Sequence, residues 1–255
     1  MAESSTRAID EPAVPLDRGD PPAGDPHAIS RTIQRAMIPT AAPRLEGYEV
    51  AAGTTLEDSG RGNSTWDHMT LADGRVALVV LDTRAEGPLP PAHILGMARA
   101  ALRTALASTD DPAEALRATN STLAALQKEG SDQFAECGVV VPDAGSVVWA
   151  SAGRTPAGVL GREGTFRQLA SHGPPLGMMD GFGYGTATEE IGVGDALLVL
   201  SGGSAGLFRG ASDLVAQVHG KPAGEIVGTV HRAIRKVRDE GSEAEEISVI
   251  YLRRH

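Results

Sequence analysis

The segment Arg75–Leu81 constrains the fold most strongly, because every residue after Arg75 is apolar. A strand of this composition has no polar face for solvent, so it must lie in a sheet that other elements cover on both sides. The run ends at Asp82, which precedes a polar turn. Read by itself, Asp82 is a turn or cap aspartate after a buried strand. The chain is therefore predicted to fold around a central buried strand that ends in a carboxylate.

Composition limits both the number of domains and the class of partner. The 255 residues, 41% hydrophobic and 22% charged, can build one sizeable core but hardly two. A formal net charge of -10 argues against a nucleic-acid-binding protein, which normally carries a basic stripe. The single cysteine, Cys137, is predicted to be a small buried apolar residue, compatible with a cytoplasmic location. No apolar stretch approaches the ~18 residues of a membrane span, so no membrane partner is expected.

Three segments follow from the distribution of Pro, Gly and apolar residues. The first is rich in Pro, Gly and Asp and lacks periodic apolar residues, which is typical of disorder. We predict a disordered N-terminal tail over 1–25, an amphipathic linker helix over 26–39 and one folded domain over 40–255.

The linker helix is predicted from the spacing of Ile29, Ile33 and Met37, which recur at i, i+4 and i+8 before Pro39 ends the segment. These side chains form one apolar stripe. The stripe fits two arrangements: it docks on the domain, or it pairs with a second copy of the chain.

Within the domain, the pattern predicts strands, then two adjacent helices, then many short strands, one late helix and a final strand. Asp111 and Pro112 are suitable for the cap and first turn of the second helix. The predicted strands are 47–55, 75–81, 134–141, 146–152, 165–169, 186–191, 195–201 and 247–252. The predicted helices are 90–108, a helix beginning at 111, and 222–239. This order is α+β, with mainly antiparallel sheets packed on one another and covered by helices.

Several short motifs occur in a characteristic order between residues 32 and 252. They are Ile33-Gln34-Arg35-Ala36-Met37-Ile38-Pro39, Trp66, Asp73-Gly74-Arg75, Phe134-Ala135-Glu136-Cys137, Ala150-Ser151-Ala152-Gly153 and Pro174-Pro175-Leu176-Gly177. Together they resemble the SpoIIE-like branch of the PPM (type 2C-like) serine/threonine protein phosphatases. The resemblance implies an αββα sandwich in which two mainly antiparallel sheets pack face to face and helices flank them.

The resemblance also implies a metal site, and the chain departs from it. Asp82 matches the aspartate that bridges two divalent cations, with the Thr83 carbonyl as an additional ligand. Thr65 stands where the Gly-Gly-Asp box has its aspartate, and Gly202 stands where a Thr-Asp-Gly turn has one. Glu245 replaces the last aspartate with a longer carboxylate. We expect a remnant metal site at Asp82, Thr83 and Glu245, degenerate ligand positions at Thr65 and Gly202, and no catalytic residue.

The lost carboxylates matter because Mn²⁺ and Mg²⁺ require clustered oxygen ligands, and two adjacent dications repel each other unless carboxylates intervene. One carboxylate about 4 Å from a dication contributes on the order of 8 kcal/mol at an effective dielectric near 20, before dehydration is subtracted. We therefore expect no cofactor. The hypothesis is a pseudophosphatase that regulates signalling or transcription by binding proteins.

The resemblance implies which partners such a protein would have. Active relatives act on anti-sigma-factor antagonists in partner switching, so the expected partner is such an antagonist or an anti-sigma kinase. A homodimer through residues 26–39 is a further expectation.

Two alternatives remain open from the sequence. One is an active Mn²⁺- or Mg²⁺-dependent serine/threonine phosphatase, with substitute ligands from Asp58, Asp67 or Glu86. The other is a module of the same fold whose altered cleft senses a small molecule.

Overall fold

The computed structural model describes residues 27–56, 61–85, 90–126, 133–171, 173–202, 205–239 and 246–255. The helices are α1 (Ala28–Met37), α2 (Pro91–Leu106), α3 (Pro112–Leu126), α4 (Ala205–Val218) and α5 (Ala223–Asp239). The strands are β1 (Tyr48–Thr54), β2 (Ser64–Thr70), β3 (Val76–Ala85), β4 (Gln133–Asp143), β5 (Ser146–Ala152), β6 (Ala157–Leu160), β7 (Phe166–Gln168), β8 (Thr186–Glu190), β9 (Ala196–Leu200) and β10 (Ser248–Arg254).

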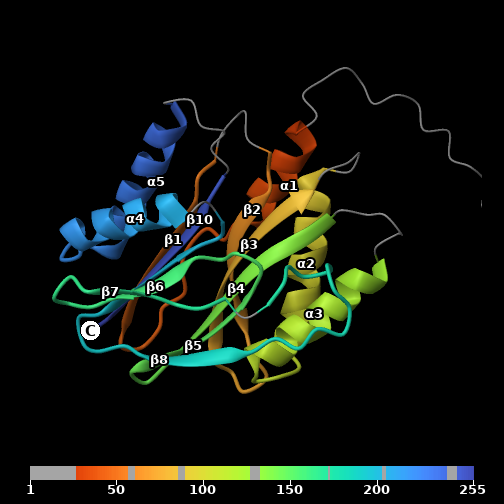
Figure 1. Cartoon of the computed structure of the whole chain (residues 1–255), viewed down its shortest axis with the longest axis horizontal. Helices are drawn as coiled ribbons and strands as arrows, with labels where there is room; N and C mark the ends of the chain where they lie inside the picture. Colours follow the sequence, from red (N-terminus) through yellow and green to blue (C-terminus); the bar gives the residue numbers. More distant parts are fainter. Residues whose placement is uncertain are drawn as a thin grey trace, which may run out of the picture.

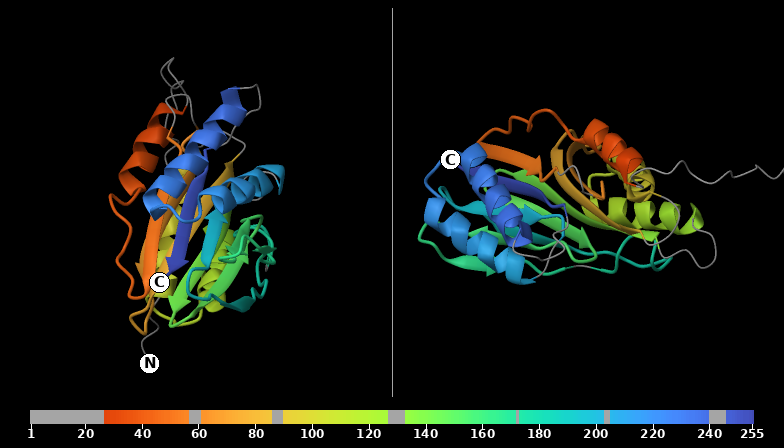
Figure 2. Two further views of the ribbon diagram at one scale, coloured as in Figure 1. Left: turned by 90° about the vertical axis from the view of Figure 1, so that its left-hand side faces the viewer. Right: turned by 90° about the horizontal axis from the view of Figure 1, so that it is seen from above.

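The strands form two sheets that pack face to face (Figure 1). Sheet A has the order β1-β10-β9-β6-β7, and sheet B has the order β2-β3-β4-β5-β8. Neighbouring strands in both sheets run antiparallel. Helices α4 and α5 lie on one side of the sandwich, and α2 and α3 lie on the other (Figure 2). The fold is the predicted αββα sandwich.

The core has three apolar layers, and β3 contributes to two of them. Val79 and Leu81 pack in the layer between sheet B and helices α2 and α3. Leu78 and Val80 alternate with them and pack in the layer between the two sheets. All four side chains are fully buried, and each contributes roughly 1.5–3 kcal/mol by leaving water. The prediction that this strand is buried on both faces is confirmed.

The C-terminal third contains one helix more than the sequence pattern indicated. The predicted helix over 222–239 is present as α5, with Ile226, Val230 and Ile234 buried. Helix α4 precedes it and packs on the outer face of sheet A with α5. The strand β6 was also not predicted. The expectation of one late helix is therefore wrong, because tertiary packing stabilises α4 although Gly206 and Gly210 weaken its intrinsic helix propensity.

Helix α1 docks through its polar face. Ser30 and Gln34 are fully buried, whereas Ile29 is 66% exposed and Ile33 is 40% exposed. Only Met37 of the predicted apolar stripe packs against the core beneath α2. Of the two arrangements considered for the stripe, the one in which all of it docks on the domain is therefore wrong. The buried polar side chains instead hydrogen-bond to backbone groups of the domain, which replaces apolar burial as the anchor.

Two expectations drawn from composition concern the cysteine and the membrane. Cys137 is fully buried on β4, as predicted, and this burial raises the pKa of its thiol. Among the residues described, no helix is long and apolar enough to cross a lipid bilayer.

His231 gives the fold a specific response to acid. It lies on α5 against Gly53 of β1, and burial lowers the pKa of its imidazole to about 4. The unfolded chain takes up this proton near pH 6.5, so below that pH the unfolded state binds more protons than the folded state. We expect stability to fall between pH 6.5 and 4, by up to on the order of 3 kcal/mol from this residue. In urea unfolding over that range, His231→Gln should flatten the pH dependence.

The matched control is His93→Gln, because His93 lies exposed at the start of α2. That variant should keep the wild-type pH dependence. An unchanged acid slope in His231→Gln would contradict the assignment.

Candidate functional site

Asp82 lies near the end of β3, on the face of sheet B that meets sheet A. It lies on the same face of the strand as Leu78 and Val80 of the inter-sheet layer and is only 1% exposed. Its Oδ1 accepts hydrogen bonds from Asn63 Nδ2 and from the Thr83 N–H, both at 2.9 Å. Such bonds offset the cost of burying a carboxylate. The Thr83 carbonyl also lies at this position, 3.5 Å from Asn63 Nδ2.

Strand β2 brings Ser64, and not Thr65, to Asp82. In the register of β2 and β3, Ser64 is opposite Asp82 and Thr65 is opposite Leu81. Successive side chains point to opposite faces of a sheet, so Thr65 is directed toward the layer beneath α2. A shift of one residue in a strand moves a side chain to the other face. The position predicted at Thr65 is therefore occupied in space by Ser64.

Ser64 belongs to a chain of buried hydroxyl groups that joins the two sheets. Its Oγ lies 2.7 Å from Ser201 Oγ and 2.8 Å from Ser248 Oγ. Ser248 Oγ lies 2.8 Å from Thr54 Oγ1 on β1. The three serines are fully buried. Because a hydroxyl both donates and accepts, this hydroxyl chain satisfies its own members without any net charge.

Gly202 lies directly beside Asp82, so the structure brings these two predicted positions together. A Cβ atom at Gly202 would lie 2.5 Å from Asp82 Oδ2. The space that an aspartate side chain would need is occupied by the Asp82 carboxylate itself.

Glu245 lies outside the described residues, but its neighbour Glu246 is described and is 4% exposed. Glu246 Oε2 accepts hydrogen bonds from the Gly62 N–H at 2.7 Å, the Asn63 N–H at 3.3 Å and Gln34 Nε2 at 3.1 Å. This carboxylate oxygen joins α1 to the segment before β2. Its role was not predicted, because residues far apart in sequence supply the donors.

Asp67 does not reach the Asp82 site. It lies on the opposite face of β2 from Ser64, where its Oδ2 is 2.8 Å from Arg99 Nε and 2.6 Å from Arg103 Nη2. Asp67 is 2% exposed, so these ion pairs hold α2 against sheet B. The other candidate substitute ligands, Asp58 and Glu86, lie outside the described residues.

A second acidic residue, Glu136, was missed as a site residue. It lies on β4 directly opposite Asp82 and is 3% exposed. Arg154 Nε is 3.9 Å from Glu136 Oε1. Like charges in directly opposed positions of a sheet are unfavourable unless a positive group is near. The sequence signal was available, since Glu136 is a charged residue inside an apolar strand.

The residues that the structure describes do not fit a two-metal centre. They include no group of three or more His, Cys, Asp and Glu side chains that could hold a metal ion. Two divalent cations bring four positive charges, whereas the described carboxylates at this position are Asp82 and Glu136, and Asp82 Oδ1 already accepts hydrogen bonds from Asn63 Nδ2 and the Thr83 N–H. The donor set present can satisfy Asp82 without a cation.

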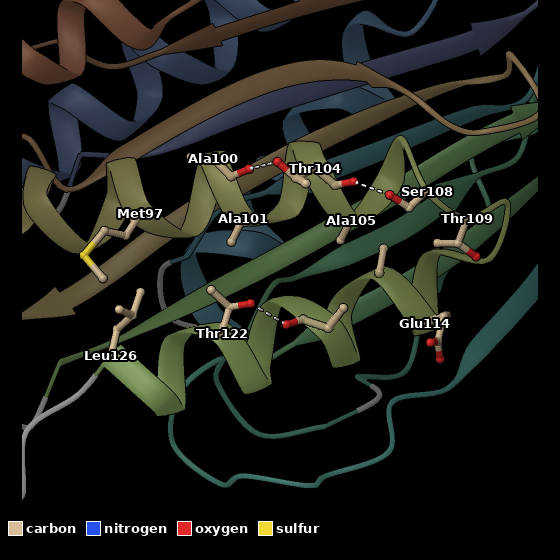
Figure 3. A pocket seen from close by; sticks show the side chains of 12 residues that line it. Met97, Ala100, Ala101, Thr104, Ala105, Ser108, Thr109, Glu114, Thr122 and Leu126 are labelled. Carbon is tan, nitrogen blue, oxygen red and sulfur yellow. Dashed lines mark hydrogen bonds between the residues drawn. The ribbon is translucent and has the colours of Figure 1, made fainter. Parts of the chain in front are cut away.

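A separate groove of about 810 Å³ lies between α2 and α3, on the outer side of sheet B (Figure 3). Small side chains line most of it. The hydroxyls of Thr104, Ser108 and Thr122 each donate to the backbone carbonyl four residues earlier in the chain. These hydroxyl protons are already used in local hydrogen bonds and are not offered to a ligand. The groove exists because the side chains where α2 and α3 meet are small.

The fold is that of a PP2C-type phosphatase domain. A solved structure of the SiaA PP2C domain of Pseudomonas aeruginosa superposes with a TM-score of 0.69 at 19% identity, covering 89% of this chain and 95% of that one. The RsbU and RsbW domains of Rv1364c from Mycobacterium tuberculosis give 0.66 at 22% identity, covering 85% and 64%. The phosphatase domain and regulatory fragment of SpoIIE from Bacillus subtilis give 0.61 at 19% identity, covering 81% and 61%.

The chain thus spans less than two thirds of the last two structures. No curated protein sequence matches it. The family model of stage II sporulation protein E (SpoIIE) matches residues 72–255. The chain belongs to the SpoIIE family.

The contact between Gly202 and Asp82 predicts a specific sensitivity. Gly202→Ala should destabilise the domain by about 1–3 kcal/mol, because the new methyl group must displace a carboxylate that two hydrogen bonds hold in place. Urea unfolding measures this change. Gly210→Ala is the control, since a Cβ there meets open space on α4, and it should be neutral or stabilising.

In an Asp82→Ala background the cost of Gly202→Ala should largely disappear, because the obstructing carboxylate is absent. An equal cost in both backgrounds would show that the contact does not limit this position.

Proposed function

We propose that this SpoIIE-family domain is a pseudophosphatase that regulates signalling or transcription by binding a protein. The observation that carries the proposal is the packing of Gly202 against Asp82, which leaves no space for a neighbouring carboxylate. The hydroxyl chain supports it, because Ser64, the residue opposite Asp82 on β2, is neutral and is linked through Ser201 and Ser248 to sheet A. In this proposal, Thr83, which adjoins Asp82, and the acidic residue Glu245 are remnants of the former metal site.

The proposed partner is a protein of a partner-switching pathway, such as an anti-sigma-factor antagonist or an anti-sigma kinase, in the cytoplasm. Two similar structures support this choice by their names. One contains RsbU and RsbW domains together. The other is described as the bacterial stressosome, a modular system adapted to control secondary messenger signalling. In this role the domain would recognise its partner without turning it over.

The proposal predicts no metal-dependent turnover. Mn²⁺ and Mg²⁺ are titrated calorimetrically into the full chain, and hydrolysis of a phosphoserine peptide and an aryl phosphate is followed. We expect neither turnover nor binding that depends on Asp82, because the described residues supply too few carboxylates. Asp110→Asn, at an exposed position, is the control for Asp82→Asn. Micromolar Mn²⁺ binding with turnover that Asp82→Asn abolishes would establish the active-phosphatase alternative.

The exposed face of α1 supports a homodimer as part of this function. Ile29 and Ile33 lie one turn apart on a helix whose polar side chains Ser30 and Gln34 are buried. Pairing with the same face of a second copy would remove both isoleucine side chains from water.

We expect Ile29→Glu with Ile33→Glu to shift the mass measured by light scattering from dimer to monomer. Val193→Glu, at a residue 61% exposed on another part of the surface, should leave the mass unchanged. A monomeric wild-type chain at high concentration would refute the dimer.

A further inference from the structure

Strand β8 forms one edge of sheet B, next to β5 (Figure 1). Just beyond the paired residues of these strands, the Ile191 N–H donates to the Gly145 carbonyl at 3.0 Å. Hydrogen-bonded pairs alternate along an antiparallel ladder, so this bond determines which residues of β8 bond to β5. Every second residue of β8 does so. The residues whose N–H and C=O groups instead point to the open side are Thr186, Thr188 and Glu190.

The other edge of sheet B, β2, is closed by side chains. The Ser64 carbonyl accepts a hydrogen bond from Gln34 Nε2 at 2.7 Å, and the His68 carbonyl accepts one from Arg103 Nη2 at 3.3 Å. These carbonyls point away from β3, because the ladder between β2 and β3 uses the alternate residues. The side chains thus occupy groups that another strand could bind.

The open side of β8 has no such closure. Among the residues that the structure describes, no side chain and no backbone group outside the ladder of β5 and β8 hydrogen-bonds to it. The strand contains neither proline nor lysine, two residues that commonly protect an edge. The side chains of its outward-pointing residues are exposed as well. The edge of β8 is therefore a template for an additional strand.

The charge of β8 decides which strand can be added. Glu189 pairs with Arg167 of β7, whereas the exposed Glu190 has no ion pair within the described part of the chain. The strand itself contains no basic residue. A second copy pairing through β8 would bring the glutamates of both strands into one ladder, which is unfavourable. A basic side chain opposite Glu190 would form a favourable cross-strand pair instead.

We propose that β8 binds an extended segment of the protein partner as an additional antiparallel strand, with a basic side chain opposite Glu190. β-Branched side chains suit the positions opposite Thr186 and Thr188. This inference rests on the proposed function and specifies the surface and the chemistry of the partner. Backbone hydrogen bonds supply the affinity, and the side-chain pairs select the segment. The surface is separate from Asp82, because β4 and β5 lie between β3 and β8.

Amide hydrogen exchange in the full chain tests the open edge itself. The amides of Thr188 and Glu190 should exchange at least about tenfold faster than those of Ala187 and Glu189, whose N–H groups bond to β5. Equal protection of the two sets would show that another part of the chain covers the edge, and would overturn the proposal.

The probe for the added strand is the acetylated and amidated peptide Lys-Thr-Val-Thr-Val. In an antiparallel register it places lysine opposite Glu190 and the first valine opposite Thr188. In an NMR titration of the full chain it should shift the amide signals of these two residues, with millimolar affinity because the interface is small. N-methylation of the first valine, whose N–H faces β8, should abolish binding. N-methylation of the second threonine, whose N–H faces away, should change it little.

Variants of the chain test the same surface. Thr188→Pro removes an outward N–H and keeps the bonds to β5, so it should abolish peptide binding without unfolding the edge. A peptide with glutamate in place of lysine should bind the wild-type chain about two- to fivefold more weakly. Glu190→Lys should reverse this preference, and it is the second probe if Thr188→Pro does not fold. The control Glu163→Lys, exposed in the turn between β6 and β7, should retain the preference for lysine.

The proposal is overturned if the lysine peptide does not bind up to about 10 mM, if N-methylation of the first valine has no effect, or if Glu190→Lys keeps the preference for lysine. Self-association that Thr188→Pro abolishes, measured by light scattering, would assign the edge to a second copy and would also overturn it. The titration contains no metal and measures no turnover. Its failure is therefore distinguishable from failure of the pseudophosphatase proposal, which the Mn²⁺ and hydrolysis measurements test.

Discussion

Strand β3 is buried on both faces, and the other layers are arranged around it. Val79 and Leu81 require a helical layer on one side, and Leu78 and Val80 require a second sheet on the other. When the strand reaches its polar end, the alternation places Asp82 on the inter-sheet side. A carboxylate buried in that place must be satisfied by its surroundings. Asn63 and the Thr83 N–H do this, and the close approach of the Gly202 backbone follows from the same lack of space.

Local chemistry explains why much of the fold was readable from the sequence. The apolar run of β3 and the Asp111-Pro112 start of α3 each depend on residues within a few positions. The Asp111 carboxylate indeed accepts a hydrogen bond from the Ala113 N–H at 2.9 Å. Helix α4 was missed because its glycines lower local propensity, while its burial against sheet A depends on distant strands. The spacing of apolar residues in α1 predicted a helix correctly, but not which face would be buried.

The site was less readable, because it depends on register and on contacts between distant segments. The motif comparison gave Thr65 as a degenerate ligand position, whereas strand pairing places Ser64 opposite Asp82. Gly202 lies beside Asp82 in the structure, and its role as a former ligand position stays a prediction, as does that of Glu245. The role of Glu246 needed three donors from two other segments. The position of Glu136 beside Asp82 becomes visible only when β3 and β4 are paired.

The hydroxyl chain across Thr54, Ser248, Ser64 and Ser201 determines under which conditions this end of the sandwich stays connected by hydrogen bonds. Serine and threonine hydroxyls do not ionise in the physiological range, and their mutual hydrogen bonds require no bound ion. The connection between the two sheets is complete as soon as the chain has folded. Because none of its members changes charge, the connection keeps the same hydrogen-bonding groups across the physiological pH range.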